Sequence, residues 1–210
     1  MKHLCKLILI LLVMFVSCNR PEDDTLEKIT DTIIGKYMCK SATIQDGHLL
    51  DIDGNGIVSD DVIAEFERLE AAFWAIKDRP VRISPVKEYG QVANINIEIP
   101  KQRVNYDKRT GEYIIKIMSG SSMYICFRYS VDESGKIITW PYNEGNSTLG
   151  WEDKDMIELI DYRDNSAKEI IFDQKGGFQA LIDCNFYDFA TDKMMTVPVL
   201  FVYERVSYSL

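Results

Sequence analysis

The stretch Asn94-Ile95-Asn96-Ile97-Glu98-Ile99 alternates polar and apolar residues at every position. Successive side chains of a β-strand point to opposite faces of its sheet, so this alternation is typical of a strand with one face in the core and one in water. Further strand-like segments, separated by turn-forming residues, are 37–44, 113–118, 123–131, 137–140, 156–162, 169–172, 178–186 and 197–206. About eight to ten short strands with this spacing predict an all-β fold, an antiparallel barrel or sandwich.

One segment has the periodicity of a helix instead. Its apolar residues recur at steps of three and four and would share one helix face: Val62, Phe66, Leu69, Phe73 and Ile76. Ser59 is a suitable N-cap, and Pro80 prevents the helix from continuing. We therefore expect a helix over about 60–77 whose apolar stripe packs on the core.

The N-terminus has the pattern of a secretory signal. Lys2 and Lys6 form a basic start, and residues 7–16 form a nearly unbroken apolar run. That run is about ten residues long, whereas a helix needs about twenty apolar residues to cross a membrane. We therefore expect residues 1–17 to be a signal peptide that is removed.

Ser17 and Cys18 follow this run directly. Together with it they resemble the lipobox of bacterial lipoproteins, with Phe15 where leucine is usual. The resemblance implies cleavage before Cys18 and attachment of diacylglycerol to that cysteine. It implies a lipoprotein of the Gram-negative cell envelope, held in the outer membrane and facing the periplasm or the exterior. An ordinary cleaved signal followed by an incidental cysteine is the alternative.

The remaining chain is acidic. Residues 18–27 form an expected tether, and residues 28–210 have the length of a single domain. The formal net charge of the whole chain is −9. It falls to about −11 once Lys2 and Lys6 are removed. An acidic surface is repelled by phosphates, which argues against a nucleic-acid partner. For the same reason the lipid, and not a basic patch, would hold the protein to a membrane.

Three short motifs carry a second resemblance. Gly35-Lys36-Tyr37 opens the first expected strand, Asp51-Ile52-Asp53-Gly54-Asn55-Gly56 follows it, and Tyr203-Glu204-Arg205 lies in the last strand. Together they resemble lipocalin-like lipoproteins of Gram-negative gut bacteria, with Tyr37 in place of the usual tryptophan. The resemblance implies a barrel in which the closing arginine packs over the opening aromatic ring. We therefore expect a cation–π contact between Tyr37 and Arg205.

The acidic motif has the spacing of a calcium loop. The expected ligands are the side chains of Asp51, Asp53 and Asn55, the backbone carbonyl of Ile57, and Asp61. Oxygen-bearing side chains that alternate around Gly56 can supply the roughly six to eight oxygens that Ca²⁺ prefers. The twelfth position, where a bidentate acid belongs, is Val62, while Asp60 and Glu65 are near but out of register. The alternative is a turn whose acidic side chains bond to their own backbone.

Three cysteines would remain after processing and lipidation: Cys39, Cys126 and Cys184. All three lie in strand-like segments, so they are either buried small hydrophobic residues or include one disulfide. Because Cys184 alternates with Ile182 and Phe186, its thiol is expected to point into the core.

Little in the sequence supports catalysis. His48 is the only histidine left after processing, which leaves no multi-histidine zinc site and little room for a serine or cysteine triad. We therefore expect a non-enzymatic binding protein whose barrel holds a small apolar ligand. The alternative is a surface or periplasmic interaction protein with a solid barrel, stabilised by Ca²⁺, whose loops bind a protein partner.

Overall fold

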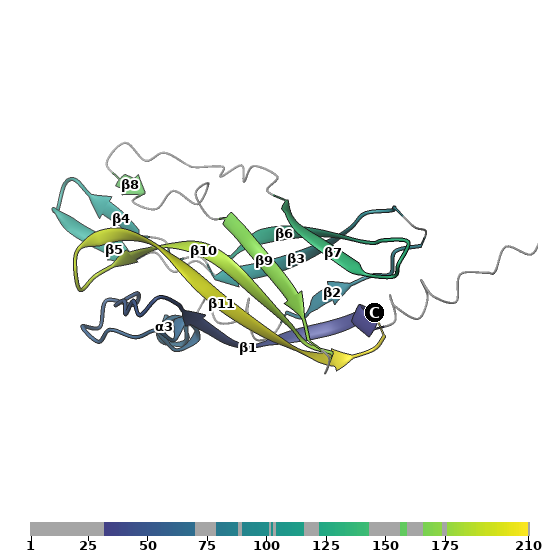
Figure 1. Ribbon diagram of the computed structural model, residues 1–210. Helices are drawn as coiled ribbons and strands as arrows, with labels where there is room; N and C mark the ends of the chain where they lie inside the picture. The colour runs from purple at the N-terminus through teal and green to yellow at the C-terminus, as the bar shows by residue number, and fades with distance from the viewer. Residues whose placement is uncertain are drawn as a thin grey trace, which may run out of the picture.

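The computed structural model describes residues 32–69, 79–87, 90–100, 102, 104–115, 122–142, 156–158, 166–173 and 176–209. Within these residues the chain forms three antiparallel β-sheets and the helix α3 (Figure 1). The prediction of an all-β antiparallel fold is confirmed. No helix among the described residues is long and apolar enough to cross a membrane. The expected signal peptide, Cys18 and the tether lie outside the described residues.

The largest sheet has five strands in the order β2-β1-β11-β10-β9. Their bounds are β1 Gly35–Ile44, β2 Val81–Ile83, β9 Ser166–Phe172, β10 Phe178–Asp188 and β11 Lys193–Ser207. β10 and β11 form a long hairpin whose register runs unbroken from Phe178 opposite Tyr203 to Asp188 opposite Lys193. This hairpin fixes the position of the turn that later contacts the acidic loop.

Two smaller sheets have three strands each, in the orders β3-β6-β7 and β5-β4-β8. Their bounds are β3 Ala93–Pro100, β4 Val104–Asp107, β5 Glu112–Ile115, β6 Ser122–Val131, β7 Ile137–Tyr142 and β8 Met156–Glu158. In β3 the isoleucines are buried, while Asn94 and Asn96 are exposed, as the alternation predicted. Glu98 differs, because it is only 8 % exposed and pairs with Arg79.

Two seams join the five-stranded sheet to the sheet β3-β6-β7. β2 lies beside β3 and β7 lies beside β9, but neither pair forms a hydrogen-bonded ladder. At the second seam the Thr139 hydroxyl donates to the Ile170 carbonyl over 3.1 Å. The two sheets therefore enclose one core between them, as in a barrel that is interrupted at two seams.

The described interior of this core is filled by large side chains. The bulkiest of the fully buried residues are Tyr37, Tyr129, Phe66, Phe127, Phe178 and Phe201. Phe178 stacks on Tyr203 with ring centroids 4.5 Å apart and meets Tyr37 edge-on at 5.1 Å. Each such ring buries a large apolar area, which stabilises the fold.

The expected contact between the first and last strands is confirmed. Tyr37 of β1 is the register partner of Arg205 of β11. The Arg205 guanidinium carbon lies 5.4 Å from the centroid of the Tyr37 ring, and its Nε donates to the Tyr37 hydroxyl over 3.2 Å. That hydroxyl in turn donates to the Ile33 carbonyl. Burial raises the pKa of Tyr37, so the ring stays neutral beside the guanidinium.

The helix begins later than predicted. α3 spans Val62–Arg68, and its N-cap is Asp61, whose side chain accepts from the Ala64 N–H over 3.1 Å. Ser59 was predicted as the N-cap, but its backbone is extended and bonded to Leu50 in both directions. Phe66 packs inward as expected and lies 5.9 Å from the Phe186 ring. Phe73 and Ile76, in the second half of the predicted stripe, lie outside the described residues.

None of the three cysteines Cys39, Cys126 and Cys184 forms a disulfide, so the disulfide alternative is not realised. Cys184 is 1 % exposed and points into the core, as the alternation predicted. Burial raises the pKa of its thiol far above the ordinary value.

We therefore expect Cys184 to resist alkylation in the folded protein, because neither the reagent nor the thiolate form is available there. The measurement is labelling with iodoacetamide at pH 8, with the label located by peptide mass spectrometry. In denaturant Cys184 should label as fast as Cys126, which is only half-buried. Rapid labelling of Cys184 without denaturant would contradict its place in the core.

Candidate metal centre

The acidic loop is organised around the carboxylate of Asp51. Its Oδ1 accepts from the N–H groups of Gly54 at 2.9 Å and Asn55 at 3.1 Å, and its Oδ2 accepts from Gly56 at 2.9 Å. Gly54 and Gly56 have φ angles of 74° and 84°, which favour glycine. The alternation of glycine with short polar residues therefore folds this loop around one buried acid, which is 2 % exposed.

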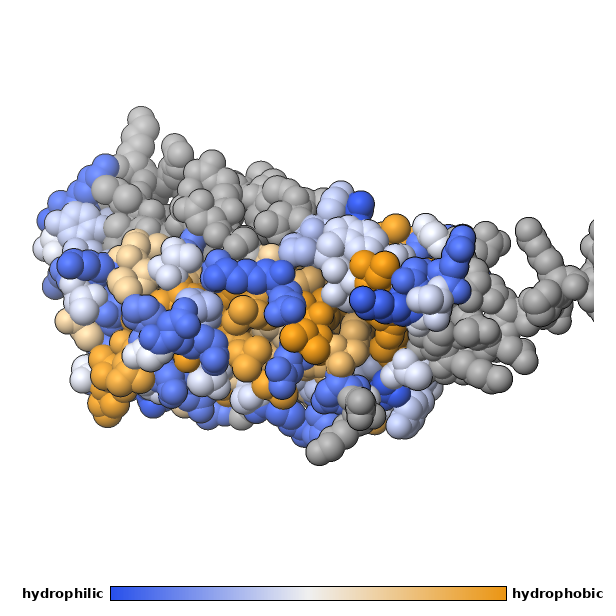
Figure 2. Space-filling view, viewed as in Figure 1, coloured by the Kyte–Doolittle hydropathy of each residue, from blue (hydrophilic) through white to orange (hydrophobic). Residues whose placement is uncertain are grey.

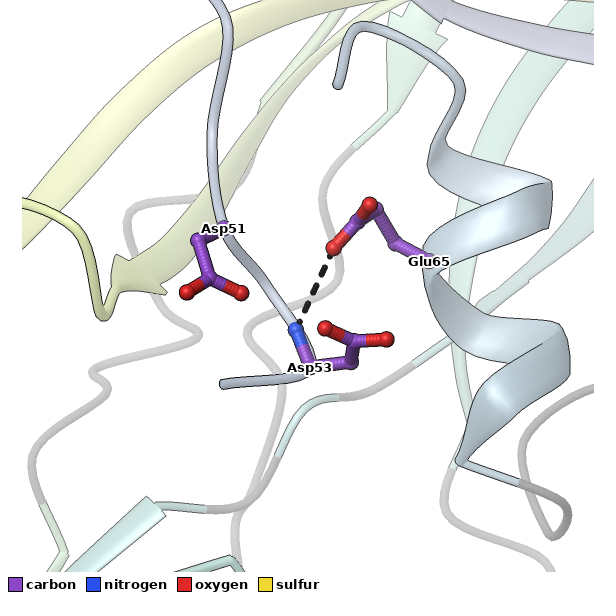
Figure 3. A group of neighbouring side chains, drawn as sticks. All are labelled: Asp51, Asp53 and Glu65. Atoms are coloured by element: carbon purple, nitrogen blue, oxygen red, sulfur yellow. Dashed lines mark hydrogen bonds between the residues drawn. The ribbon is translucent and has the colours of Figure 1, made fainter. Parts of the chain in front are cut away.

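Two further carboxylates join Asp51, as Figure 3 shows. Asp53 comes from the same loop, and Glu65 reaches across from α3. Each of the three acids places a carboxylate oxygen within 4.8 Å of the other two. Glu65 is fully buried, and its Oε2 accepts from the N–H groups of Ile52 at 2.9 Å and Asp53 at 3.3 Å. This acidic centre, defined as Asp51, Asp53 and Glu65, could hold a metal ion.

Arg68 is the cation of the centre. Its guanidinium bonds to the carboxylates of both Asp53 and Glu65, and its own side chain is 43 % exposed. Three ionised carboxylates and one guanidinium leave a formal charge of about −2 in a partly desolvated place. Burial raises the pKa of Glu65, although the Ile52 N–H and Arg68 oppose that shift. A divalent cation would offset the remaining charge.

Three residues outside the loop hold it against the β10–β11 turn. The Asp51 N–H donates to Asp188 Oδ1 over 2.9 Å, and the Phe189 N–H donates to the Asp51 carbonyl over 2.9 Å. The buried amide of Gln102 donates to the carbonyls of Ile52 at 2.7 Å and Tyr187 at 2.9 Å. Nothing in the sequence singled out Asp188 or Gln102, because both are far from the loop along the chain.

Of the three expected acidic ligands, the structure brings Asp51 and Asp53 together, and it adds Glu65. Asn55 is turned along the loop: its Oδ1 accepts from the Ile57 N–H over 2.7 Å, and its Nδ2 donates to Asp53 Oδ2 over 2.9 Å. Ile57 is 64 % exposed. Asp61 caps α3 and is not among the clustered acids. The signal for Glu65 was its position one helical turn after Asp61, which directs its side chain back toward the loop.

The fold and the centre together define an all-β protein with an acidic cluster between a loop and a short helix. No protein-family model, no curated protein and no solved structure matches this chain. The argument for function therefore rests on the residues of the chain itself.

Proposed function

We propose that this chain is a non-enzymatic, lipid-anchored interaction protein of the cell envelope, whose solid β-domain is stabilised by Ca²⁺ at the acidic centre. The observation that carries the proposal is the arrangement of three carboxylates within 4.8 Å of one another. Two of them, Asp51 and Glu65, are buried, and the third is bonded to Arg68. They lie at the base of a loop that exposes apolar side chains.

Calcium is the cation that we propose for this centre. Ca²⁺ takes about six to eight oxygen ligands in a flexible geometry, whereas Mg²⁺ demands a near-ideal octahedron and keeps several of its waters. Three carboxylates that lie within 4.8 Å of one another, on a loop and a helix, suit the less demanding ion. Backbone carbonyls and water would supply the remaining oxygens. Because Ca²⁺ binds the ionised form of Glu65, whose pKa is raised, we expect binding to weaken as the pH falls.

Interaction through the surface has more support than a ligand inside the barrel. The described core is filled by aromatic and aliphatic side chains. Two pockets of the described residues lie at the seams, and both are lined by charged residues, among them Lys168 and Glu169 at one and Arg82 at the other. A small apolar ligand would need an apolar cavity. The barrel that holds such a ligand, which was the first expectation, therefore has less support than the solid barrel.

The loop itself offers an apolar surface. Leu49, Ile57 and Val58 are 53 %, 64 % and 42 % exposed, although all three are aliphatic. Figure 2 shows apolar side chains gathered at the lower left, over the loop that precedes α3. Exposed apolar groups of this kind mark contact sites for partners. Calcium below the loop would fix its shape for such a contact.

Calcium is expected to raise the melting temperature of the protein. Binding to the folded state alone adds about 2.7 kcal/mol of stability at a hundredfold excess over the dissociation constant. That constant is expected near 10⁻⁴–10⁻³ M, the range of extracellular calcium modules. The measurement is thermal unfolding in CaCl₂ against unfolding in chelator, with calorimetric titration of the folded protein.

Matched variants separate a metal site from an acidic turn. Asp53→Asn and Glu65→Gln should lose the calcium-dependent shift. Asp132→Asn should keep it, because Asp132 forms a similar turn, accepting from the Ser134 and Lys136 N–H groups, but has no clustered acids. A melting temperature that is equal in calcium and chelator, with no heat on titration, would leave only a hydrogen-bonded turn.

The lipid anchor gives a separate prediction. Cys18→Ser should release the protein from membranes or leave it with its signal attached, because a chain of net charge −9 is repelled by anionic lipid. The measurement is fractionation of cells into soluble and membrane pools, with intact mass of the product. Cys39→Ser is the control and should stay in the membrane pool. A Cys18→Ser protein that is processed and still sediments with washed membranes would overturn the anchor.

A further inference from the structure

A second candidate site lies far from the acidic centre, at the seam between β2 and β3. These two strands lie side by side without a hydrogen-bonded ladder, and the gap forms a cavity of about 260 Å³ that opens at the surface. This volume lies just below the roughly 300–1,000 Å³ of sites for drug-sized ligands. The cavity therefore suits a molecule smaller than a typical drug.

The charge in this cavity is opposite to that of the chain. Two of its lining residues are Arg79 and Arg82, and the one acid is Glu98. Glu98 is 8 % exposed and accepts from Arg79 Nη1 over 3.2 Å, so these two charges offset each other. Arg82 is exposed between two buried neighbours of β2 and has no hydrogen-bond or ion-pair partner in the described part of the chain. A chain of net charge −9 thus presents an uncompensated guanidinium at a cavity.

The neighbours of Arg82 supply a ring and an amide. Tyr124 of β6 is the register partner of Glu98 and is 56 % exposed, which is unusual for so large a ring. Asn96 is exposed two residues before Glu98, so both project from the same face of β3. An exposed tyrosine face can stack on a flat or chair-shaped ring, and an amide can both donate to and accept from a hydroxyl.

We propose that this cavity binds a small carboxylic acid built on a six-membered ring. The carboxylate would accept two N–H bonds from the Arg82 guanidinium, a geometry that arginine favours. The ring would lie on Tyr124, and a ring hydroxyl would meet the Asn96 amide. A sugar acid and an aromatic acid share this chemistry. The site is independent of the calcium centre and lies outside the proposed function.

The test is a titration of the purified full chain, in buffer freed of divalent cations so that no metal bridges an acid to the acidic centre. The probes are D-glucuronate, 4-hydroxybenzoate and the uncharged methyl glucoside, and binding is followed by NMR shifts or calorimetry. We expect saturable binding of at least one acid and none of methyl glucoside over the same range. Arg82→Gln should weaken that binding about tenfold or more, and Tyr124→Leu should weaken it as well.

Arg109→Gln is the matched control, because Arg109 is also exposed but bonds to Asp107 in another sheet. It should leave binding unchanged. Binding of glucuronate alone would assign the site to sugar acids, and binding of 4-hydroxybenzoate alone would assign it to aromatic acids. The proposal fails if neither acid saturates, if methyl glucoside binds as well as the acids do, or if Arg82→Gln binds like the unaltered chain.

Discussion

Replacing Phe66 by alanine is expected to lower the free energy of unfolding by about 3–5 kcal/mol. The Phe66 side chain is 1 % exposed and lies 5.9 Å from the Phe186 ring, centroid to centroid. It is the main apolar contact of α3, a helix that the structure gives only seven residues. A helix so short is not stable alone, so losing this ring removes the packing that holds it. The measurement is unfolding in urea, followed by far-ultraviolet circular dichroism.

An alanine substitution of an exposed apolar residue provides the comparison. Ile171 is 52 % exposed, and Ile171→Ala should change the stability by no more than about 0.5 kcal/mol. Phe66→Ala should shift the urea midpoint while the slope of the transition stays the same. A midpoint equal to that of the unaltered protein would mean that α3 does not pack on the core through Phe66. Because Glu65 is the neighbouring residue, the calcium response is expected to weaken together with the stability.

Gly35→Ala is expected to destabilise the protein by about 2–5 kcal/mol, although it adds a single methyl group. Gly35 has a φ of 145°, and a Cβ built on it would lie 2.2 Å from the Ser207 carbonyl oxygen. An alanine at positive φ costs about 1–2 kcal/mol, and forcing a methyl group against backbone adds about 1–3 kcal/mol. To relieve the clash between the added methyl group and the Ser207 carbonyl, β1 and β11 would have to separate near the Tyr37–Arg205 contact. Urea unfolding measures the loss.

Gly47→Ala separates the two causes. Gly47 also has a positive φ, 75°, but a Cβ there would meet nothing within 4 Å. Gly47→Ala should therefore lower the free energy of unfolding by only about 1 kcal/mol. This is the cost of placing alanine at a positive φ, reduced because alanine also lowers the entropy of the unfolded chain. If the two variants were equally stable, the close approach of the Ser207 carbonyl to Gly35 would have no energetic weight.

The strands could be predicted because their signal is local. Alternation in β3 requires only that neighbouring side chains point to opposite faces, and the buried isoleucines and the inward Cys184 followed from it. The Tyr37–Arg205 contact was predicted because short motifs at the two ends of the domain resemble those of a known family. The register of β1 and β11 confirms this contact. Boundaries were less accurate: Ser59 was expected to cap the helix, but its backbone pairs with Leu50.

The acidic centre was half predicted. Asp51 and Asp53 were recognised because loop spacing is a property of the sequence. Glu65 does not fall on a ligand position when the residues of a calcium loop are counted from Asp51. That count does not apply to Glu65, because Glu65 lies in a helix. In the helix each turn returns the side chains to the same face, which brings Glu65 back over the loop. The replacement of Asp61 by Glu65 in the cluster follows from this geometry.

The sequence by itself determined the fold class, the inward and outward faces of the strands, and the acidic loop with its glycines. Each depends on residues within a few positions of one another, where periodicity and backbone preference act directly. Only the tertiary structure shows that Gln102 and Asp188 hold the loop, that Cys39, Cys126 and Cys184 form no disulfide, and that Arg82 and Tyr124 line one cavity at a seam. These relations join segments far apart in the chain, and such segments approach one another only when the sheets close around the shared core.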